Sequence, residues 1–254
     1  AVAKAIVREA EKTGPPVEIV RNGSRGMLWL EPLVEVETDM GRVAYGPVST
    51  SDVADLFKAK FHEGGAHKLS HGLTEEIPYF KNQERLTFAR CGITDPLSID
   101  GYRAHGGFEG LTKALTMDPA DIVEEVTTSG LRGRGGAAFP TGIKWKTVLD
   151  TKAEQKYICC NADEGDSGTF ADRMLMEGDP FCLIEGMTIA GIAVGATKGY
   201  IYVRSEYPHA IAALLAAIQI LPDANWRGPT IQGSPPAFAL FVRVAARRST
   251  IAQT

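Results

Sequence analysis

Cysteine is scarce in this sequence, and its pattern excludes several classes of protein. The 254 residues include only Cys91, Cys159, Cys160 and Cys182, and none of them form a CxxC pair. This density is too low for a disulfide framework, so we expect reduced thiols in a cytoplasmic protein. Cys159 and Cys160 are adjacent on an expected strand, so their side chains should point to opposite faces and should not chelate one metal ion.

Long apolar runs and an excess of positive charge are missing as well. The most apolar stretch, residues 181–197, is interrupted by Glu185 and is shorter than the about 20 residues of a membrane-spanning helix. No basic-then-apolar segment typical of a signal peptide opens the chain. The 27 Lys and Arg are outnumbered by 31 Asp and Glu, for a formal net charge of -4, which argues against a cationic nucleic-acid-binding protein.

The pattern of expected elements divides the chain into two α/β units. Residues 1–62 should hold helices over 2–11 and 51–60, a strand over 17–20 and a hairpin with strands over 33–37 and 42–45. Residues 63–100 carry little periodic signal, and we expect them to be a linker. His62, His67 and His71 lie in or beside this linker. No Cys or carboxylate pattern accompanies them, which favours a solvated segment over a metal site.

Residues 101–254 form the second expected unit, in which helices and strands alternate. We expect helices over 107–116, 118–127, 140–149, 181–194 and 208–221, and strands over 156–160, 200–204 and 237–244. This order is typical of an α/β domain with a largely parallel sheet. Ligands of such sheets bind beyond the carboxyl ends of the strands.

A glycine-rich stretch precedes the expected helix over 140–149. Five glycines lie within residues 130–142, and Gly133-x-Gly135-x-x-Ala138 fits a dinucleotide-binding pattern. The stretch follows an expected helix and not a strand, so an ordinary Rossmann phosphate turn is disfavoured. Glycines let backbone N–H groups approach a phosphate closely, and nearby cations would favour the anion. The cations here are Arg132, Arg134 and Lys144. This combination favours a bound anion over a flexible surface loop.

An acidic loop follows the expected strand over 156–160. It carries Asn161, Asp163, Glu164 and Asp166, at the strand end where ligands of parallel sheets bind. Carboxylate and amide groups suit ribityl or ribose hydroxyls and ring N–H groups, and they do not suit phosphate. The spacing of a calcium loop is absent. A solvated acidic turn is the alternative interpretation of this loop.

Taken together, these stretches resemble one protein family closely. The resemblance is carried by residues 129–145, by Cys-Asn-Ala-Asp-Glu at 160–164, by Glu-Gly-Met at 185–187 and by Gly-Tyr-Ile-Tyr-Val-Arg-Ser-Glu-Tyr at 199–207. They look like the flavin-containing, NADH-binding (diaphorase) subunits of respiratory complex I, NAD-reducing hydrogenases and NAD-dependent formate dehydrogenases. The resemblance covers about residues 100–244.

The resemblance implies cofactors and roles for particular residues. One pocket would hold FMN, and NADH would stack on the flavin and donate a hydride to it, after which electrons leave singly to iron–sulfur clusters. The resemblance implies that the flavin and its phosphate are bound by Gly133, Arg134, Gly135, Gly136 and Lys144. Asn161, Asp163 and Glu164 would hold the ribityl chain and the flavin ring. Phe139 would stack on the NADH adenine, and Asp166 would lie near the nicotinamide. No side chain need act as a base, and Glu164 and Asp166 would orient the hydride transfer.

The first sixty residues resemble a thioredoxin-like partner domain that normally carries a [2Fe–2S] cluster. The cluster would need cysteines near Ser24 and Leu28, and none is present. This favours the flavin (beta) subunit of a soluble formate dehydrogenase, with an iron–sulfur thioredoxin-like subunit and a molybdenum or tungsten catalytic subunit as partners. A hydrogenase diaphorase subunit, a complex I subunit and a non-catalytic assembly module are the alternatives.

The sequence departs from the family at both ends. The thioredoxin-like half begins midway, and residues 245–254 replace a segment that in the family completes the nucleotide site. The family's C-terminal domain with its [4Fe–4S] cluster is expected to be missing. Missing nucleotide contacts would weaken FMN retention by the isolated chain, and the function that the resemblance implies is that of the subunit and not of these 254 residues alone.

Overall fold

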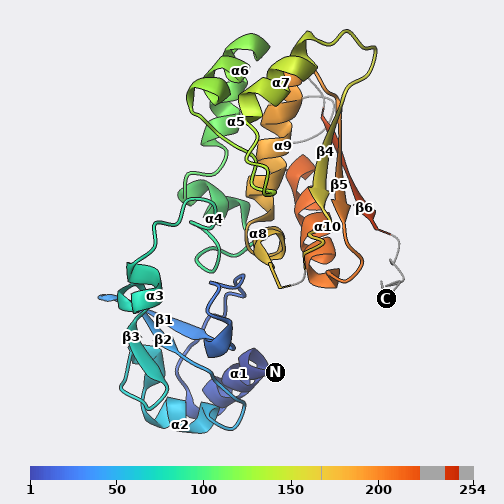
Figure 1. Ribbon diagram of the computed structural model, residues 1–254. Coiled ribbons are helices and arrows are strands. Elements are labelled where there is room, and N and C mark those ends of the chain that lie inside the picture. The colour runs from blue at the N-terminus through green and yellow to red at the C-terminus, as the bar shows by residue number, and fades with distance from the viewer. Residues whose placement is uncertain (167, 224–237, 246–254) are drawn as a thin grey trace, which may run out of the picture. The chain divides into compact units, whose positions relative to one another are not determined.

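The chain forms two compact units, Ala1–Ala89 and Arg90–Thr254. The structure is a computed structural model that describes residues 1–166, 168–223 and 238–245. Figure 1 labels the helices and strands of both units.

The first unit, residues 1–89, is built on an antiparallel sheet with strand order β1-β2-β3. A buried cluster that includes Ile6, Tyr45 and Leu56 joins the sheet to the helices α1 and α2. The elements are α1 (Val2–Thr13), β1 (Val34–Thr38), β2 (Gly41–Tyr45), α2 (Val53–Lys58), β3 (Ser70–Leu73) and α3 (Pro78–Lys81), with short 3-10 turns at Leu28–Leu30, Phe61–Glu63 and Thr74–Glu76. The expected hairpin and both expected helices are therefore confirmed. The likeness to a thioredoxin-like domain rests on the sequence and stays a prediction.

Two expectations for this part of the chain are wrong. Residues 17–20 form no strand; Pro15 and Pro16, which lack N–H donors, precede them. The expected linker over 63–100 contains β3, which pairs with β2, and the division between the units falls after Ala89. The sequence of β3, Ser-His-Gly-Leu, has no alternation of apolar and polar residues, and Gly72 has a φ of 74°, so its pattern did not indicate a strand.

The second unit, residues 90–254, has a parallel sheet with strand order β4-β5-β6. The expected α/β fold with a parallel sheet is confirmed. The register runs from Tyr157↔Lys198 to Ala162↔Val203 between β4 and β5. The elements are α4 (Ile99–Ala104), α5 (Glu109–Ala114), α6 (Pro119–Thr128), α7 (Thr141–Asp150), β4 (Tyr157–Ala162), α8 (Ala171–Gly178), α9 (Pro180–Val194), β5 (Lys198–Val203), α10 (Pro208–Asp223) and β6 (Ala239–Val244).

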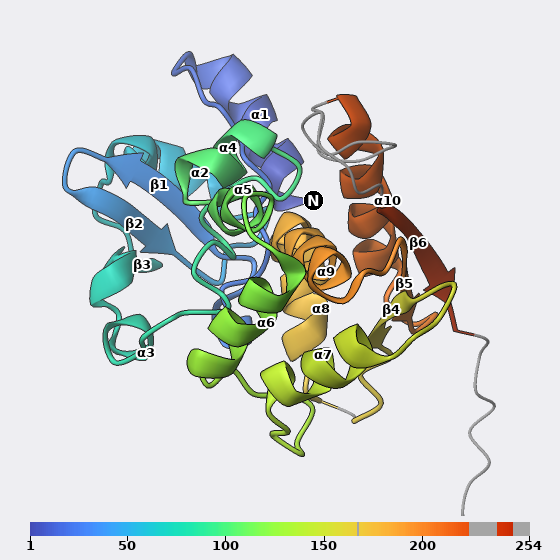
Figure 2. The same cartoon turned by 90° about the horizontal axis from the view of Figure 1, so that it is seen from above.

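The two faces of this sheet differ in what covers them. Ile201 and Val203 are fully buried in the core cluster that includes side chains of α9 and α10. On the other face, Tyr157 and Tyr202 are about half exposed, at 49% and 47%. Figures 1 and 2 show α9 and α10 on one side of the three strands. The strands alternate as expected, and Cys159 is exposed whereas Cys160 is partly buried.

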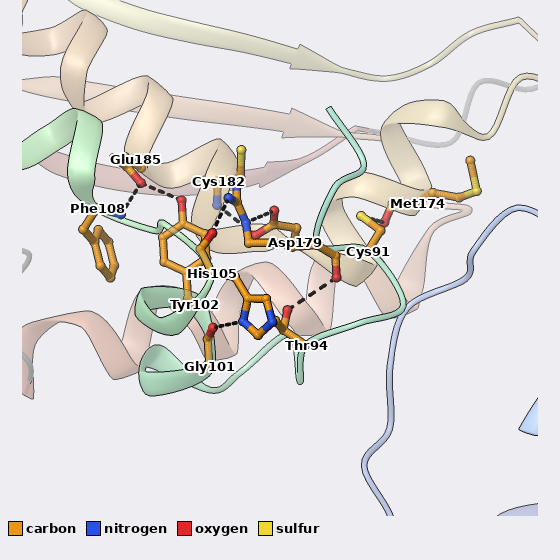
Figure 3. Close-up of polar contacts among 11 residues, drawn as sticks. Cys91, Thr94, Gly101, Tyr102, His105, Phe108, Met174, Asp179, Cys182 and Glu185 are labelled. Atoms are coloured by element: carbon orange, nitrogen blue, oxygen red, sulfur yellow. Dashed lines mark hydrogen bonds and ion pairs between the residues drawn. The ribbon is translucent and has the colours of Figure 1, made fainter. Parts of the chain in front are cut away.

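A buried polar network ties residues 90–111 to α8 and α9 (Figure 3). The carboxylate of Glu185 accepts hydrogen bonds from the Tyr102 hydroxyl and from the backbone N–H groups of Phe108 and Leu111. Arg90 Nε lies 2.8 Å from Asp179 Oδ2. These bonds explain why the second unit begins at residue 90 and not near residue 101, as the pattern predicted.

Candidate functional site

The glycine loop, residues 130–140, connects α6 to α7. Hydrogen bonds join its two ends at the base, and its tip is exposed to solvent. Its base is held by backbone hydrogen bonds from Gly133 N–H to the Phe139 carbonyl and from Thr141 N–H to the Leu131 carbonyl, each 2.9 Å long. Arg132 uses its guanidinium to close the loop further, donating to the Ala138 carbonyl at 3.0 Å. The residues between these contacts are exposed.

The tip of this loop leaves its backbone accessible from outside. A Cβ atom built on Gly135 or Gly136 would meet no heavy atom within 4 Å. Gly136 has a φ of 99° and Ala138 a φ of 49°, so the chain turns here through the left-handed region that favours glycine. Gly142 differs, because its Cβ would lie 2.2 Å from Thr127 Oγ1. This glycine packs α7 against α6 and fixes the base of the loop.

Two cations and an aromatic ring accompany the tip. Among the residues that the structure describes, the side chains of Arg134 and Lys144 have no hydrogen-bond or ion-pair partner, and both residues are exposed. Phe139 is 49% exposed. Two free cations, open backbone and an exposed ring are the groups expected of an anion site with a flat ligand beside it.

The acidic loop leaves the carboxyl end of β4. Asn161 is an exposed residue near the end of β4. Its side-chain Oδ1 accepts a 3.2 Å hydrogen bond from Asp163 N–H. Asp166 is exposed and Asp163 is partly exposed. These polar side chains thus lie at the edge of a parallel sheet where ligands bind, as the sequence predicted.

Glu164 has a different environment from its neighbours in the loop. One carboxylate oxygen accepts from Asp172 N–H at 2.8 Å, and the other from Arg173 N–H at 3.2 Å and from the Tyr207 hydroxyl at 2.9 Å. Its carbonyl accepts from Arg204 Nη1 at 2.8 Å. The first two donors lie in the first turn of α8, so Glu164 caps this helix. In this structure the carboxylate is directed to α8, and its expected contact with the flavin ring stays a prediction.

Burial and the Glu164 carboxylate shift the pKa values of two groups nearby. Burial and the hydrogen bond to Glu164 raise the pKa of Tyr207. Burial and the charge of Glu164 raise the pKa of Asp172. Burial, with smaller contributions from Asp172 and Cys159, raises the pKa of the Cys160 thiol to about 11. Cys160 is therefore protonated at neutral pH, which fits a structural role and not a nucleophile.

A surface pocket of about 450 Å³ lies beside the acidic loop. It is formed at the start of α8, the end of β5 and the start of α10. Arg204 and Tyr207, which hold Glu164, form part of its wall together with Gly168, Phe170, Arg173, Glu177, Glu206, Pro208 and His209. The sequence predicted none of these residues as site residues, although Arg204 and Tyr207 lie in a string that carries the family resemblance. Their position could have indicated a site, because Arg204 directly follows the strand β5 and Tyr207 lies three residues later.

The predicted site residues lie in the glycine loop, in the acidic loop and on the elements beside them, with Lys144 on α7 and Asn161 near the end of β4. The glycine loop lies in front of α9 in Figure 1, and both loops lie toward the lower edge in Figure 2. Among the described residues, no hydrogen bond or ion pair joins the glycine loop to the acidic loop. That one ligand contacts both loops therefore stays a prediction.

A comparison with models of protein families identifies this part of the chain. Residues 126–250 match the Nuo51 FMN-binding domain, and this range contains both loops. This part of the chain is therefore similar to the Nuo51 FMN-binding domain. The resemblance to diaphorase subunits that the sequence predicted is therefore confirmed.

Curated relatives match about two thirds of this chain. The HndC subunit of an NADP-reducing hydrogenase from Solidesulfovibrio fructosivorans is 51% identical over 166 residues, which are 65% of this chain and 34% of the relative. A subunit of NADH-quinone oxidoreductase from Escherichia coli strain K12 is 44% identical over 165 residues, 64% of this chain and 37% of the relative. The chain thus spans about a third of the length of these relatives.

Among solved structures, the chain is similar to one in a crystal structure of an NAD+-reducing [NiFe]-hydrogenase in the H2-reduced state. The identity is 27%, the TM-score is 0.48, and the match covers 78% of this chain and 32% of the other.

The part of the chain that matches the Nuo51 domain fits an FMN by the chemistry of its groups. The empty space at Gly135 and Gly136 admits a phosphate to backbone N–H groups, and the free cations Arg134 and Lys144 can balance its charge. Asn161 and Asp163 offer partners for hydroxyl groups. No group of three or more His, Cys, Asp and Glu suited to a metal ion lies within the described residues. None of the helices in the described ranges is long and apolar enough to cross a membrane.

Proposed function

We propose that the chain carries the FMN- and NADH-binding site of a diaphorase subunit in a larger oxidoreductase. One observation carries the proposal: the Nuo51 domain presents an open glycine tip with two cations that have no partner among the described residues. The names of its relatives, an NADP-reducing hydrogenase subunit and an NADH-quinone oxidoreductase subunit, support the same chemistry.

The chain's own residues bind and orient the reactants in this proposal. Backbone N–H groups at Arg134, Gly135 and Gly136, with the side chains of Arg134 and Lys144, hold the flavin phosphate, and Gly133 closes the base of the loop beside it. Asn161 and Asp163 bind ribityl hydroxyls at the end of β4. Bound FMN supplies the redox chemistry, by which a hydride is exchanged with NAD(H) and electrons pass singly to iron–sulfur clusters.

The nucleotide is oriented by side chains around the flavin site. The exposed ring of Phe139 stacks on the adenine of NADH. Asp166 and Glu164 lie on the acidic loop and orient the nicotinamide. Holding the two reacting atoms close together, at about 3–3.5 Å, supplies much of the acceleration of such a transfer, and no side chain needs to act as a base.

The visible spectrum of the native complex tests this proposal. We expect the complex that contains this chain to carry bound flavin, and the flavin band to bleach when NADH is added without oxygen. Absence of flavin from the intact native complex would overturn the proposal and leave a non-catalytic assembly module as the function.

A glycine substitution localises the flavin. In Gly135→Ala the new methyl group meets no protein atom within 4 Å, so the fold should persist while the phosphate is blocked. Gly186→Ala is the matched control, because its Cβ also meets no atom within 4 Å, in the middle of α9. We expect at least a tenfold loss of FMN affinity in Gly135→Ala alone. Equal FMN content in both variants would contradict the assignment of the loop.

For the complete assembly we propose a soluble, cytoplasmic NAD-dependent formate dehydrogenase. The support is the first unit, which lacks the cysteines near Ser24 and Leu28 that a [2Fe–2S] cluster would need. The partners would be an iron–sulfur thioredoxin-like subunit and a molybdenum or tungsten catalytic subunit, with a [4Fe–4S] cluster between FMN and them. NAD+ reduction by the native complex with formate, and not with hydrogen, is the expected result. Reduction with hydrogen would assign a hydrogenase instead.

A further inference from the structure

Two side chains in the segment after β5 form hydrogen bonds with the acidic loop, and neither has been assigned a role. Arg204 follows the last residue of β5, and Tyr207 lies just before α10. Tyr207 is 6% exposed, and its hydroxyl donates to Glu164 Oε2 at 2.9 Å. Arg204 donates to the Glu164 carbonyl at 2.8 Å and lies with its Cζ 5.1 Å from the centroid of the Tyr207 ring. The segment that follows β5 therefore holds both the side chain of Glu164, through Tyr207, and its main chain, through Arg204.

The conformation of Glu164 requires such support. Its φ of 44° is in the left-handed region, which costs a non-glycine residue energy unless its surroundings impose it. The four hydrogen bonds from α8, Arg204 and Tyr207 impose it here. Asp163 directly precedes Glu164, so its position at the sheet edge depends on where Glu164 is held.

We propose that Tyr207 and Arg204 are positioning residues for NADH oxidation, which act through Glu164 by fixing the acidic loop against the flavin site. This proposal rests on the proposed function. In it, Tyr207 sets the direction of the Glu164 carboxylate, and Arg204 sets the turn of the main chain. Neither residue touches NADH or flavin.

Tyr207→Phe tests the hydroxyl without removing the ring that Arg204 packs on. In the native complex we expect FMN content to stay unchanged and kcat/KM for NADH, measured with an artificial electron acceptor, to fall about tenfold. Tyr157→Phe is the matched control: the same atom is removed at the start of β4, where the ring is 49% exposed, and kinetics should not change.

A double-mutant cycle shows whether Tyr207 acts through Glu164. In a Glu164→Gln background, Tyr207→Phe should change kcat/KM less than twofold. An equal fold-loss in both backgrounds, or wild-type kinetics of Tyr207→Phe, would overturn the proposal. Either result would leave the proposed function intact as long as the flavin is bound and reduced by NADH, whereas a native complex without flavin would refute that function itself.

Arg204→Lys is the second variant, in case Tyr207→Phe does not assemble. Lysine keeps the charge and loses the planar fork that reaches the Glu164 carbonyl. We expect FMN to be retained and kcat/KM for NADH to fall several-fold. An unchanged kcat/KM in this variant would overturn the proposal.

Discussion

Glu185 and Glu164 occupy similar hydrogen-bonding environments in two regions of the second unit. Each carboxylate accepts two backbone N–H groups at the start of a helix, Glu185 at α5 and Glu164 at α8, and each accepts one tyrosine hydroxyl. An arginine lies over each tyrosine ring, Arg90 over Tyr102 and Arg204 over Tyr207.

The two regions differ in their exposure. Glu185 lies on α9 and is 8% exposed, inside the largest core cluster. Glu164 lies on a loop at the sheet edge and is half-buried, with a strained main chain. In the core the arrangement joins residues 90–111 to α9 and so contributes to folding. At the edge it orients a loop whose other polar side chains remain available to a ligand.

The largest expected effect is on stability, from Glu185→Ala. The substitution leaves the Tyr102 hydroxyl and two backbone N–H groups buried without an acceptor, at about 1–3 kcal/mol each. We expect the free energy of unfolding of the second unit to fall by about 4 kcal/mol, which lies near the upper end of single substitutions. Denaturant unfolding of the purified chain measures this.

Glu164→Ala is the matched comparison for that loss. Asp172 is exposed, Arg173 is partly exposed and Tyr207 lines a surface pocket, so water can replace the carboxylate more easily than in the core, and we expect a loss of about 1 kcal/mol. Equal losses in the two variants would show that the regions do not differ in the way described.

The pH dependence of stability provides a second comparison. Burial and the hydrogen bond to Glu185 raise the pKa of Tyr102, so above about pH 10 the unfolded chain releases a proton that the folded chain keeps. The stability that Tyr102 contributes is fully present below that pH and is lost as the pH rises, by about 1.4 kcal/mol per pH unit.

The unfolding free energy should therefore decrease less steeply with pH in Tyr102→Phe between about pH 10 and 12. The slope should differ from that of the unsubstituted chain by the amount that one released proton contributes. Tyr207→Phe should flatten it less, since the pKa of Tyr207 is raised with the same sign but less far. Unfolding free energies of the three proteins at a series of alkaline pH values measure the slopes. An unchanged slope in Tyr102→Phe would contradict the account of the buried network.

The smallest expected effect is on thiol reactivity beside the two regions. Burial raises the pKa of the Cys182 thiol, next to Arg90 and Asp179, and that of the Cys160 thiol to about 11. Both should react slowly with iodoacetamide at neutral pH, because the thiolate is the reactive form. Glu185→Ala should accelerate alkylation of Cys182 several-fold and leave Cys160 unchanged, as peptide mass spectrometry would show. Equal acceleration at both thiols would mean that the effect spreads through the unit.

The sequence predicted elements with strong periodicity and failed where contacts distant in sequence decide the structure. The helix over 140–149 and the strands of the parallel sheet were expected within a few residues of α7, β4, β5 and β6, because apolar spacing and strand–helix alternation are local signals. The strand β3 and the start of the second unit at Arg90 depend on pairing with β2 and with Asp179. No local pattern of apolar residues records such contacts.

The candidate site shows the same division. The open tip at Gly135 and the polar strand end at Asn161 could be predicted, since glycine spacing and position after a strand are visible in the sequence. The capping contact of Glu164 with α8, and its bonds to Tyr207 and Arg204, depend on residues up to 43 positions away. The assignment of residues 245–254 as a departure from the family falls, from residue 246 onward, outside the described residues.

Amide hydrogen exchange of the native complex, with its flavin removed and then restored, tests the central claim most directly. The account predicts that FMN slows exchange in residues 131–139 and 161–166 and leaves residues 105–111 around the Glu185 network unchanged. Unaltered exchange in both loops, or protection confined to the pocket around Tyr207 and His209, would contradict it.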